Sequence, residues 1–145
     1  QALVVPSSFG NPRRVSNGVE YNRAMLLLAV LEKRGGLLLG NCDAYLNVIG
    51  GLSLDEPAAD LAAMLALASS FRDKPVPSDL AAIGEVGLTG ELRAVSNLGQ
   101  RLSEVRRLGF TKCLIPKRIQ GKLAAPEGLE LIRVANIREA LAALL

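Results

Sequence analysis

The pattern of apolar and polar positions along the chain is dominated by one long apolar segment. After Asp55 and Pro57, alanine, leucine and methionine occupy almost every position as far as Phe71. A helix that is apolar nearly all round is normally buried on several sides. Asp55 is suited to cap the first turn, and Pro57 fits an early helical position, where a missing N–H costs little. We therefore expect residues 55–71 to form the central helix of the fold.

Three further segments have apolar residues at helical spacing: 20–33, 97–108 and 137–145. Gly35 and Gly109 follow the first two segments, and glycine is the residue that most often ends a helix. Asn136 precedes the third segment and is a favourable N-cap residue. The boundaries of these helices are therefore predicted from local signals as well as from the apolar pattern.

Short β-prone runs fill the intervals between the helices: 1–5, 37–39, 44–49, 81–86, 91–95, 113–115 and 129–134. The mixture of strands and helices lacks a strict βαβ period, so we predict an α+β fold, a two-layer domain with helices packed on a mixed β-sheet. We see no internal boundary and expect one domain over residues 1–145. The start within a strand at Gln1 indicates a piece excised from a longer chain.

The composition narrows the class of protein. Of 145 residues, 50% are hydrophobic and 21% charged, which is typical of a folded globular chain. No apolar run reaches the roughly 20 residues of a membrane span, and the run that ends at Pro6 is too short for a signal peptide, so we expect a cytoplasmic protein without membrane contact. The chain has no histidine, which excludes Ser-His and Cys-His catalysis and removes the commonest zinc ligand. No metal site is predicted.

Two cysteines, Cys42 and Cys113, lie far apart in the sequence and form no Cys-x-x-Cys pair. Such isolated cysteines in a chain of this class are usually buried thiols. We expect buried thiols, although the sequence alone leaves a disulfide open.

The net charge of +3 is unevenly distributed along the chain. Residues 1–40 carry five basic and two acidic groups, residues 41–100 three and eight, and residues 101–145 nine and four. Two basic flanks around an acidic middle could form a phosphate-binding surface if the fold brings them together. The alternative is that these charges belong to ordinary solvated helix faces.

A glycine-rich segment runs from Gly84 to Glu91, with further glycines at Gly87 and Gly90. It does not have the spacing of a dinucleotide-binding loop, and by itself it predicts a tight hairpin. The chain also lacks the Gly-x-x-x-x-Gly-Lys-[Ser/Thr] loop, so we do not expect it to bind ATP as a P-loop protein does.

The segment from Gly84 to Arg93, followed by Asn97, Leu98 and Arg101, resembles the corresponding part of the Lon-protease domain. The resemblance is closer still to the Lon-like C-terminal domain of the RadA (Sms) family of bacterial DNA-repair ATPases. Further matching stretches are residues 8–14, 22–23, 31–34, 55–62 and 69–75. Each stretch alone is weakly specific, but together they cover essentially the whole chain in one order.

The resemblance allows a chemical test, because Lon proteases use a Ser–Lys dyad, in which the amine activates the hydroxyl. The serine of Asp-Gly-Pro-Ser-Ala-Gly falls on Ala58, and the lysine that follows Gly-Gly-Leu falls on Gly99. Both halves of the dyad are absent, so we expect this domain not to be an enzyme. The serines and lysines that remain show no spacing that singles out a replacement pair. An unrecognised dyad is the alternative.

Binding remains as the expected role. Seven basic residues in or beside loops are candidates for DNA contact: Arg13, Arg14, Arg23, Arg72, Lys74, Lys117 and Arg118. Such residues suit phosphate contacts, which give affinity without base readout. The chain has three Phe, two Tyr and no Trp, which argues against a stacking platform for single strands and favours duplex or branched DNA. The alternative is that Arg13, Arg14 and Arg72 pair with acidic residues of a neighbouring subunit.

The RadA resemblance also implies a setting. Members of that family join a zinc finger, a RecA-like ATPase and a Lon-like domain, and promote branch migration as hexameric helicases in homologous recombination. This domain would then be a DNA-binding, ring-forming scaffold, with DNA, further copies of itself and the RecA recombinase as partners. ATP, magnesium and zinc would bind only the N-terminal domains, so no cofactor is expected here. A Lon-type serine peptidase and a purely structural oligomerisation domain are the alternatives.

Overall fold

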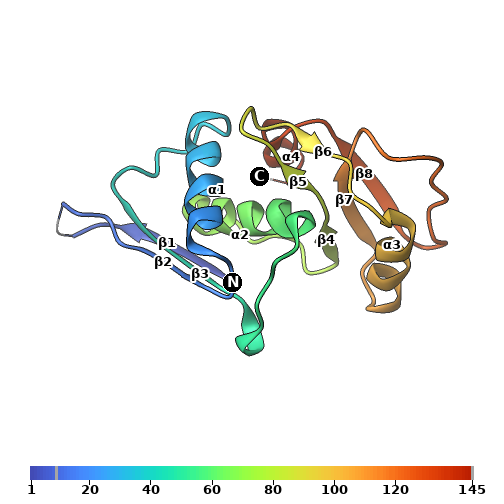
Figure 1. Ribbon diagram of the computed structural model, residues 1–145, viewed down its shortest axis with the longest axis horizontal. Helices are drawn as coiled ribbons and strands as arrows, with labels where there is room; N and C mark the ends of the chain where they lie inside the picture. Colours follow the sequence, from blue (N-terminus) through green and yellow to red (C-terminus); the bar gives the residue numbers. More distant parts are fainter. Residues whose placement is uncertain (9, 145) are drawn as a thin grey trace.

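The computed structural model describes residues 1–8 and 10–144 (Figure 1). Phe9, in the family-like stretch 8–14, and Leu145, the predicted end of the last helix, lie outside the described residues. The elements in chain order are β1 (Ala2–Pro6), β2 (Arg14–Asn17), α1 (Tyr21–Lys33), β3 (Cys42–Asn47), η1 (Ile49–Gly51), η2 (Pro57–Ala59), α2 (Asp60–Arg72), β4 (Leu80–Ala82), β5 (Glu85–Val86), β6 (Leu92–Arg93), α3 (Leu98–Arg107), β7 (Lys112–Pro116), β8 (Glu130–Val134) and α4 (Ile137–Leu144). The α+β class is confirmed.

The strands are divided among small sheets rather than joined in one. In the first sheet, of order β1-β3-β2, β1 is antiparallel and β2 parallel to β3. In the second sheet, of order β4-β7-β8, the strands are parallel, and β5 and β6 form a separate antiparallel pair. Figure 1 shows the two three-stranded sheets at opposite ends of the long axis, with α1 and α2 between them.

Helix α2 is the centre of the fold, as predicted. Leu61, Met64, Leu67 and Ala68 are almost inaccessible to solvent, because α2 packs against β1, α1, α4 and the β4–β5 segment. The predicted start at Asp55 is wrong, since the α-helix begins at Asp60 and no side chain caps it. Residues 57–59 form a tighter 3-10 turn instead.

The predicted strand at 37–39 is also wrong, since these residues belong to no strand. Leu37 and Leu39 are buried, whereas Leu38 is 80% exposed, an alternation typical of a strand that the run of three leucines did not itself reveal. Side chains satisfy the backbone of Leu39: its N–H donates to Oε1 of Glu32 (3.2 Å), and its carbonyl accepts from Nη2 of Arg14 (2.8 Å). A strand-like pattern therefore forms here without a neighbouring strand.

The run predicted as one strand over 81–86 is interrupted at Gly84. The Gly84 N–H donates to the Ala58 carbonyl (2.9 Å), and the Gly84 carbonyl accepts from the Leu61 N–H (3.1 Å). These bonds join the chain to the start of α2 and separate β4 from β5. The main-chain groups of Gly84 thus fix the position at which α2 begins.

The other helix boundaries follow the local sequence signals. Glu20 caps α1 by accepting from the N–H groups of Asn22 (3.1 Å) and Arg23 (2.9 Å). Asn136 caps α4 by accepting from the Glu139 N–H (2.8 Å), as predicted. Gly109 follows α3 with a φ of +99°, a conformation that costs glycine little.

Candidate functional site

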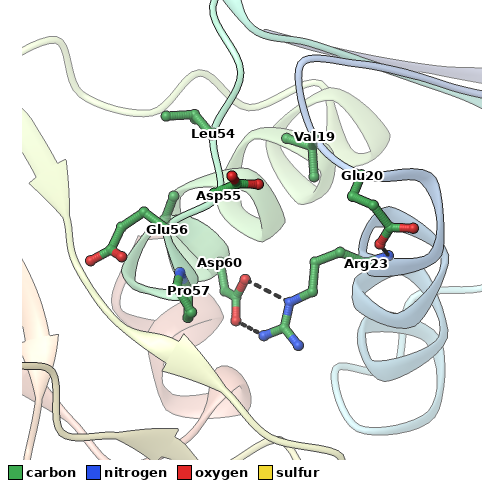
Figure 2. Close-up of a pocket in the computed structure, with 9 residues that line it drawn as sticks. Val19, Glu20, Arg23, Leu54, Asp55, Glu56, Pro57 and Asp60 are labelled. Carbon is green, nitrogen blue, oxygen red and sulfur yellow. Dashed lines mark hydrogen bonds and ion pairs between the residues drawn. The ribbon is translucent and has the colours of Figure 1, made fainter.

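The beginning of α2 has two chemically different sides, one facing α1 and the other facing α3. On the α1 side, the Arg23 side chain reaches from α1 to Asp60, the first residue of α2 (Figure 2). Arg23 Nε donates to Asp60 Oδ1 (3.0 Å), and Arg23 Nη2 forms an ion pair with Asp60 Oδ2. The Val86 N–H adds a third bond to Asp60 Oδ2 (3.1 Å). The carboxylate is therefore held by α1 and by β5.

The Asp60 carboxylate is largely desolvated, at only 4% exposed, whereas the Arg23 side chain is 32% exposed. The hydrogen bond to Asp60 raises the pKa of the Arg23 guanidinium above its ordinary value, and burial opposes this shift. A buried carboxylate without a cationic partner would be strongly unfavourable. Arg23 is thus accounted for by the fold, and we remove it from the residues proposed to contact DNA.

A hollow of about 320 Å³ lies next to this ion pair (Figure 2). Its lining includes the ion-paired Arg23 and Asp60, together with Leu54, Asp55, Glu56 and Pro57. The hollow is thus bounded mainly by carboxylates and apolar groups.

On the α3 side lie Ala58 and Gly99, the two positions on which the resemblance places the Lon dyad. Ala58 is 6% exposed and belongs to a small apolar cluster with Ile83, Val95, Leu98 and Leu102. Gly99 lies exposed in the first turn of α3, and a Cβ added there would meet open space. A groove of about 450 Å³ includes Ala58 and the neighbour of Gly99, Gln100. The residues that line this groove include no serine and no lysine, so the groove lacks the hydroxyl and the amine of a Ser–Lys dyad.

Two of the charged residues that line this groove are paired with each other. Arg101 of α3 forms an ion pair with Glu56, and its Nε donates to the Ser96 carbonyl (2.8 Å). Elsewhere, serine hydroxyls bond to main-chain groups: Ser69 Oγ donates to the Lys74 carbonyl (2.6 Å), and Ser103 Oγ donates to the Gly99 carbonyl (3.1 Å). These serines are therefore held in structural hydrogen bonds.

The candidate DNA-contacting residues divide into two groups at different ends of the molecule. Arg14 pairs in register with Ala44, which pairs with Val4, so these three residues form one row across the first sheet. The Val4 N–H donates to Ser70 Oγ (2.9 Å), which brings the end of α2 to this row. We use the name sheet-end group for the four candidate basic residues at this end of the molecule: Arg13, Arg14, Arg72 and Lys74.

Lys117 and Arg118 lie in the second group, directly after β7. They line a hollow of about 800 Å³ together with Arg93 of β6. Arg93 was not among the predicted residues, and its Nη2 forms an ion pair of 4.0 Å with Oε2 of Glu91. We name these residues the hairpin-side group: Arg93, Lys117 and Arg118.

Sequence reasoning missed Arg93 because the segments that form the hollow are distant in the chain. The Leu92 N–H donates to the Ala135 carbonyl (2.9 Å), and the Lys117 N–H donates to the Val134 carbonyl (2.8 Å). Both bonds depend on tertiary pairing around the end of β8. Lys117 and Arg118 were predicted from their place in or beside a loop of the basic segment 101–145, whereas no sequence signal pointed to Arg93 in the acidic segment 41–100.

The cysteines are free thiols, as expected. Burial raises the pKa of the Cys113 thiol to about 12, and Cys42 is half-buried. Among residues 1–8 and 10–144, no three His, Cys, Asp or Glu side chains gather in a way that could hold a metal ion. Within the same residues, no helix is both long and apolar enough to cross a membrane.

Comparison with known proteins gives concordant results. The chain is 56% identical over 141 residues to the DNA repair protein RadA of Bacillus subtilis, covering 97% of this chain and 31% of that protein. It is 50% identical over 141 residues both to RadA of Streptococcus pneumoniae, of which it covers 34%, and to RadA of Listeria monocytogenes, of which it covers 31%. The chain thus spans about a third of the length of these curated relatives.

Residues 42–145, from β3 onward, match the sequence model of the Lon protease (S16) C-terminal proteolytic domain. The matched region contains α2, α3, Ala58 and Gly99, together with the second sheet. From this match, the chain belongs to the family of Lon protease (S16) C-terminal proteolytic domains.

Proposed function

We propose that this chain is the non-proteolytic, DNA-binding Lon-like domain of a RadA-type DNA repair protein. The observation that carries the proposal is the identity of 56% to a RadA over 97% of the chain. Ala58 and Gly99 at the dyad positions support the absence of peptidase chemistry. The basic residues of the sheet-end and hairpin-side groups support a role in contacting DNA.

The physical basis of DNA contact is phosphate neutralisation by exposed cations. Arg13, Arg72, Lys117 and Arg118 are all exposed. No ion pair with an acidic side chain involves these four residues within the described part of the chain. Cations of this kind bind the sugar–phosphate backbone of any sequence and release counterions as they do so. Duplex or branched DNA, held through its backbone, is the ligand that we propose.

In the full-length protein the domain would serve as a scaffold that assembles copies into a hexameric ring. The protein would act in the cytoplasm, in homologous recombination, as an ATP-dependent branch-migration helicase, with the RecA recombinase as a partner. ATP, magnesium and zinc would be bound by other domains of that protein. These parts of the proposal rest on the similarity to RadA.

The DNA-binding part is tested by fluorescence anisotropy with a labelled duplex. Alanine at Arg13, Arg72 and Lys74 should reduce the magnitude of the slope of log K against log salt by about 0.9 for each phosphate that the variant no longer neutralises. Arg107→Ala is a control for net charge, because Arg107 already pairs with Glu104. Unchanged affinity and slope in the triple variant would remove the sheet-end group from the DNA interface.

The absence of peptidase activity is tested with unfolded casein and a serine-directed covalent probe. We expect intact casein and no labelled serine. Labelling of any serine would show that a dyad outside Ala58 and Gly99 is active, and would overturn the proposal.

A further inference from the structure

One side of the molecule combines exposed apolar side chains with carboxylates. In the segment between β3 and α2, Ile49 is 63% exposed, Leu52 64% and Leu54 42%. Leu54 borders three hollows, of about 320, 450 and 330 Å³. Glu20 and Asp55 line the first of these. We name this surface the acidic face: Glu20, Ile49, Leu52, Leu54 and Asp55.

The acidic face is held in place rather than loose. The Leu54 N–H donates to the Gly18 carbonyl (2.6 Å), next to a bridge between Val19 and Leu54. A Cβ on Gly18 would lie 2.4 Å from the Leu52 carbonyl oxygen, so the segment and Gly18 are in direct contact. Within the described residues, the Asp55 carboxylate has no hydrogen-bond or ion-pair partner. The exposed leucines and the unpaired charge therefore belong to a formed surface.

A second surface has the opposite charge around another exposed leucine. Leu88, in the turn between β5 and β6, is 68% exposed. Lys33, Arg34 and Arg138 line a hollow of about 300 Å³ next to this turn. Arg34 Nε donates to the Leu88 carbonyl (3.4 Å), which ties the turn to the end of α1. We name this surface the cationic face: Lys33, Arg34, Leu88 and Arg138.

The two faces lie on opposite sides of the molecule. Glu20 caps the first turn of α1, and Lys33 is the last residue of this 13-residue helix. At 1.5 Å per residue, α1 separates the two ends by about 20 Å. Figure 1 shows the β5–β6 turn at the top of the view and the segment between β3 and α2 at the bottom. One copy therefore cannot bring its own two faces together.

We propose that the acidic face of one copy binds the cationic face of the next copy, with Leu88 entering the hollows around Leu54. Exposed apolar groups rimmed by charge are typical of protein–protein contacts. Opposite charges around the two apolar centres select each other and disfavour contact between like faces. DNA would suit Lys33 and Arg138 but would leave Leu88 and the acidic face unused.

This contact is heterologous, because it joins two different surfaces in a head-to-tail arrangement. Such a contact generates a closed ring when the rotation between neighbours closes, and a filament when it does not. The inference rests on the assembly part of the proposed function and supplies the surfaces that perform it. It is independent of the part that concerns DNA.

Sedimentation velocity over a range of concentrations of the chain tests the apolar contact. We expect concentration-dependent association of the wild type, and weakening of about tenfold or more by Leu88→Asp, since a buried leucine would be replaced by a charge. Leu108→Asp is the matched control, because Leu108 is 60% exposed and lies at the end of α3, outside both faces. A wild type that stays monomeric, or equal effects of the two variants, would overturn the proposal.

A charge exchange tests the pairing of the two faces. Asp55→Lys and Lys33→Glu should each weaken association, whereas an equimolar mixture of the two variants should associate again, in alternating order. A mixture that stays monomeric contradicts head-to-tail pairing. DNA affinity is measured in parallel: loss of DNA binding by Lys33→Glu with unchanged association would assign the cationic face to phosphate and overturn the proposal. Absence of DNA binding by the wild type would instead refute only the DNA part of the proposed function.

Discussion

The two sides of the beginning of α2 differ in the side chains that they carry. The α1 side holds a buried ion pair, Arg23 with Asp60, completed by a main-chain bond from Val86. The α3 side, where the Lon dyad would lie, holds the methyl group of Ala58 and the bare backbone of Gly99. Asp60, whose ion pair stabilises the fold, is thus only two residues away from Ala58, which has no reactive group. The proposed absence of a nucleophile and a base on the α3 side is therefore compatible with a well-formed helix start.

The largest expected effect comes from the ion pair on the α1 side. Arg23→Met leaves the Asp60 carboxylate buried with only the Val86 N–H, and should cost about 3 kcal/mol of unfolding free energy. The double variant Arg23→Met/Asp60→Leu should recover part of this loss, because it removes the unpaired charge. Urea denaturation followed by circular dichroism measures all three proteins.

The control for Arg23→Met is the ion pair between Arg101 and Glu56 on the α3 side. Glu56 is 43% exposed and Arg101 30%, so solvent screens this pair, and Arg101→Met should cost less than about 1 kcal/mol. Equal losses for Arg23→Met and Arg101→Met would show that burial does not distinguish the two sides.

A glycine on each side gives the next comparison. Gly18 has a φ of +87°, and a Cβ there would lie 2.6 Å from Val48 Cβ, so Gly18→Ala should cost about 2 kcal/mol through strain and overlap. Gly99→Ala should be neutral or stabilise by up to about 1 kcal/mol, since the position is helical and open. Thermal unfolding of the two variants measures both effects. A Gly99→Ala loss as large as that of Gly18→Ala would contradict the open geometry of the α3 side.

Returning the hydroxyl to the dyad position should have a smaller effect. Ala58→Ser places a hydroxyl beside the apolar cluster of Ile83, Val95 and Leu98, at a residue that is 6% exposed. We expect a loss of about 1 kcal/mol, as for a poorly satisfied buried polar group, and no casein cleavage. Cleavage by this single variant would show that a base is already present, although Gly99 supplies none.

The smallest expected effect concerns the thiol of Cys113, which lies in the same apolar cluster as Ala58. We expect this thiol not to react in the folded protein. Burial holds the pKa of Cys113 at about 12, so the thiolate needed for reaction with a disulfide reagent is scarce at neutral pH. We expect the half-buried Cys42 to react first, and Cys113 to react only on unfolding. Mass spectrometry of the labelled peptides identifies the site. Rapid labelling of Cys113 in the folded protein would mean that the α3 side opens.

The local parts of the fold could be predicted from the sequence, whereas the tertiary pairings could not. Asn136 and Gly109 signalled helix boundaries because a cap depends on a few adjacent residues. The start of α2 was misplaced because it depends on Gly84, 24 residues beyond Asp60, pairing with Ala58. The strand predicted at 37–39 failed because the side chains of Glu32 and Arg14 take the place of a neighbouring strand.

The same distinction holds for the candidate site. The placement of the Lon dyad on Ala58 and Gly99 could be proposed from the sequence, since the family motifs are contiguous in sequence. The partner of Arg23 was not visible, because Asp60 lies 37 positions further along the chain. The grouping of Arg93 with Lys117 and Arg118 likewise required the structure.

The salt dependence of duplex DNA affinity is the decisive measurement for the claim that this Lon-like domain binds the DNA backbone. Anisotropy with one labelled duplex at several salt concentrations gives log K against log salt for the wild-type chain. We expect a straight line with a negative slope of several units, since about 0.9 is expected for each phosphate contact. An affinity that does not change with salt, or no binding at low salt, would refute the claim.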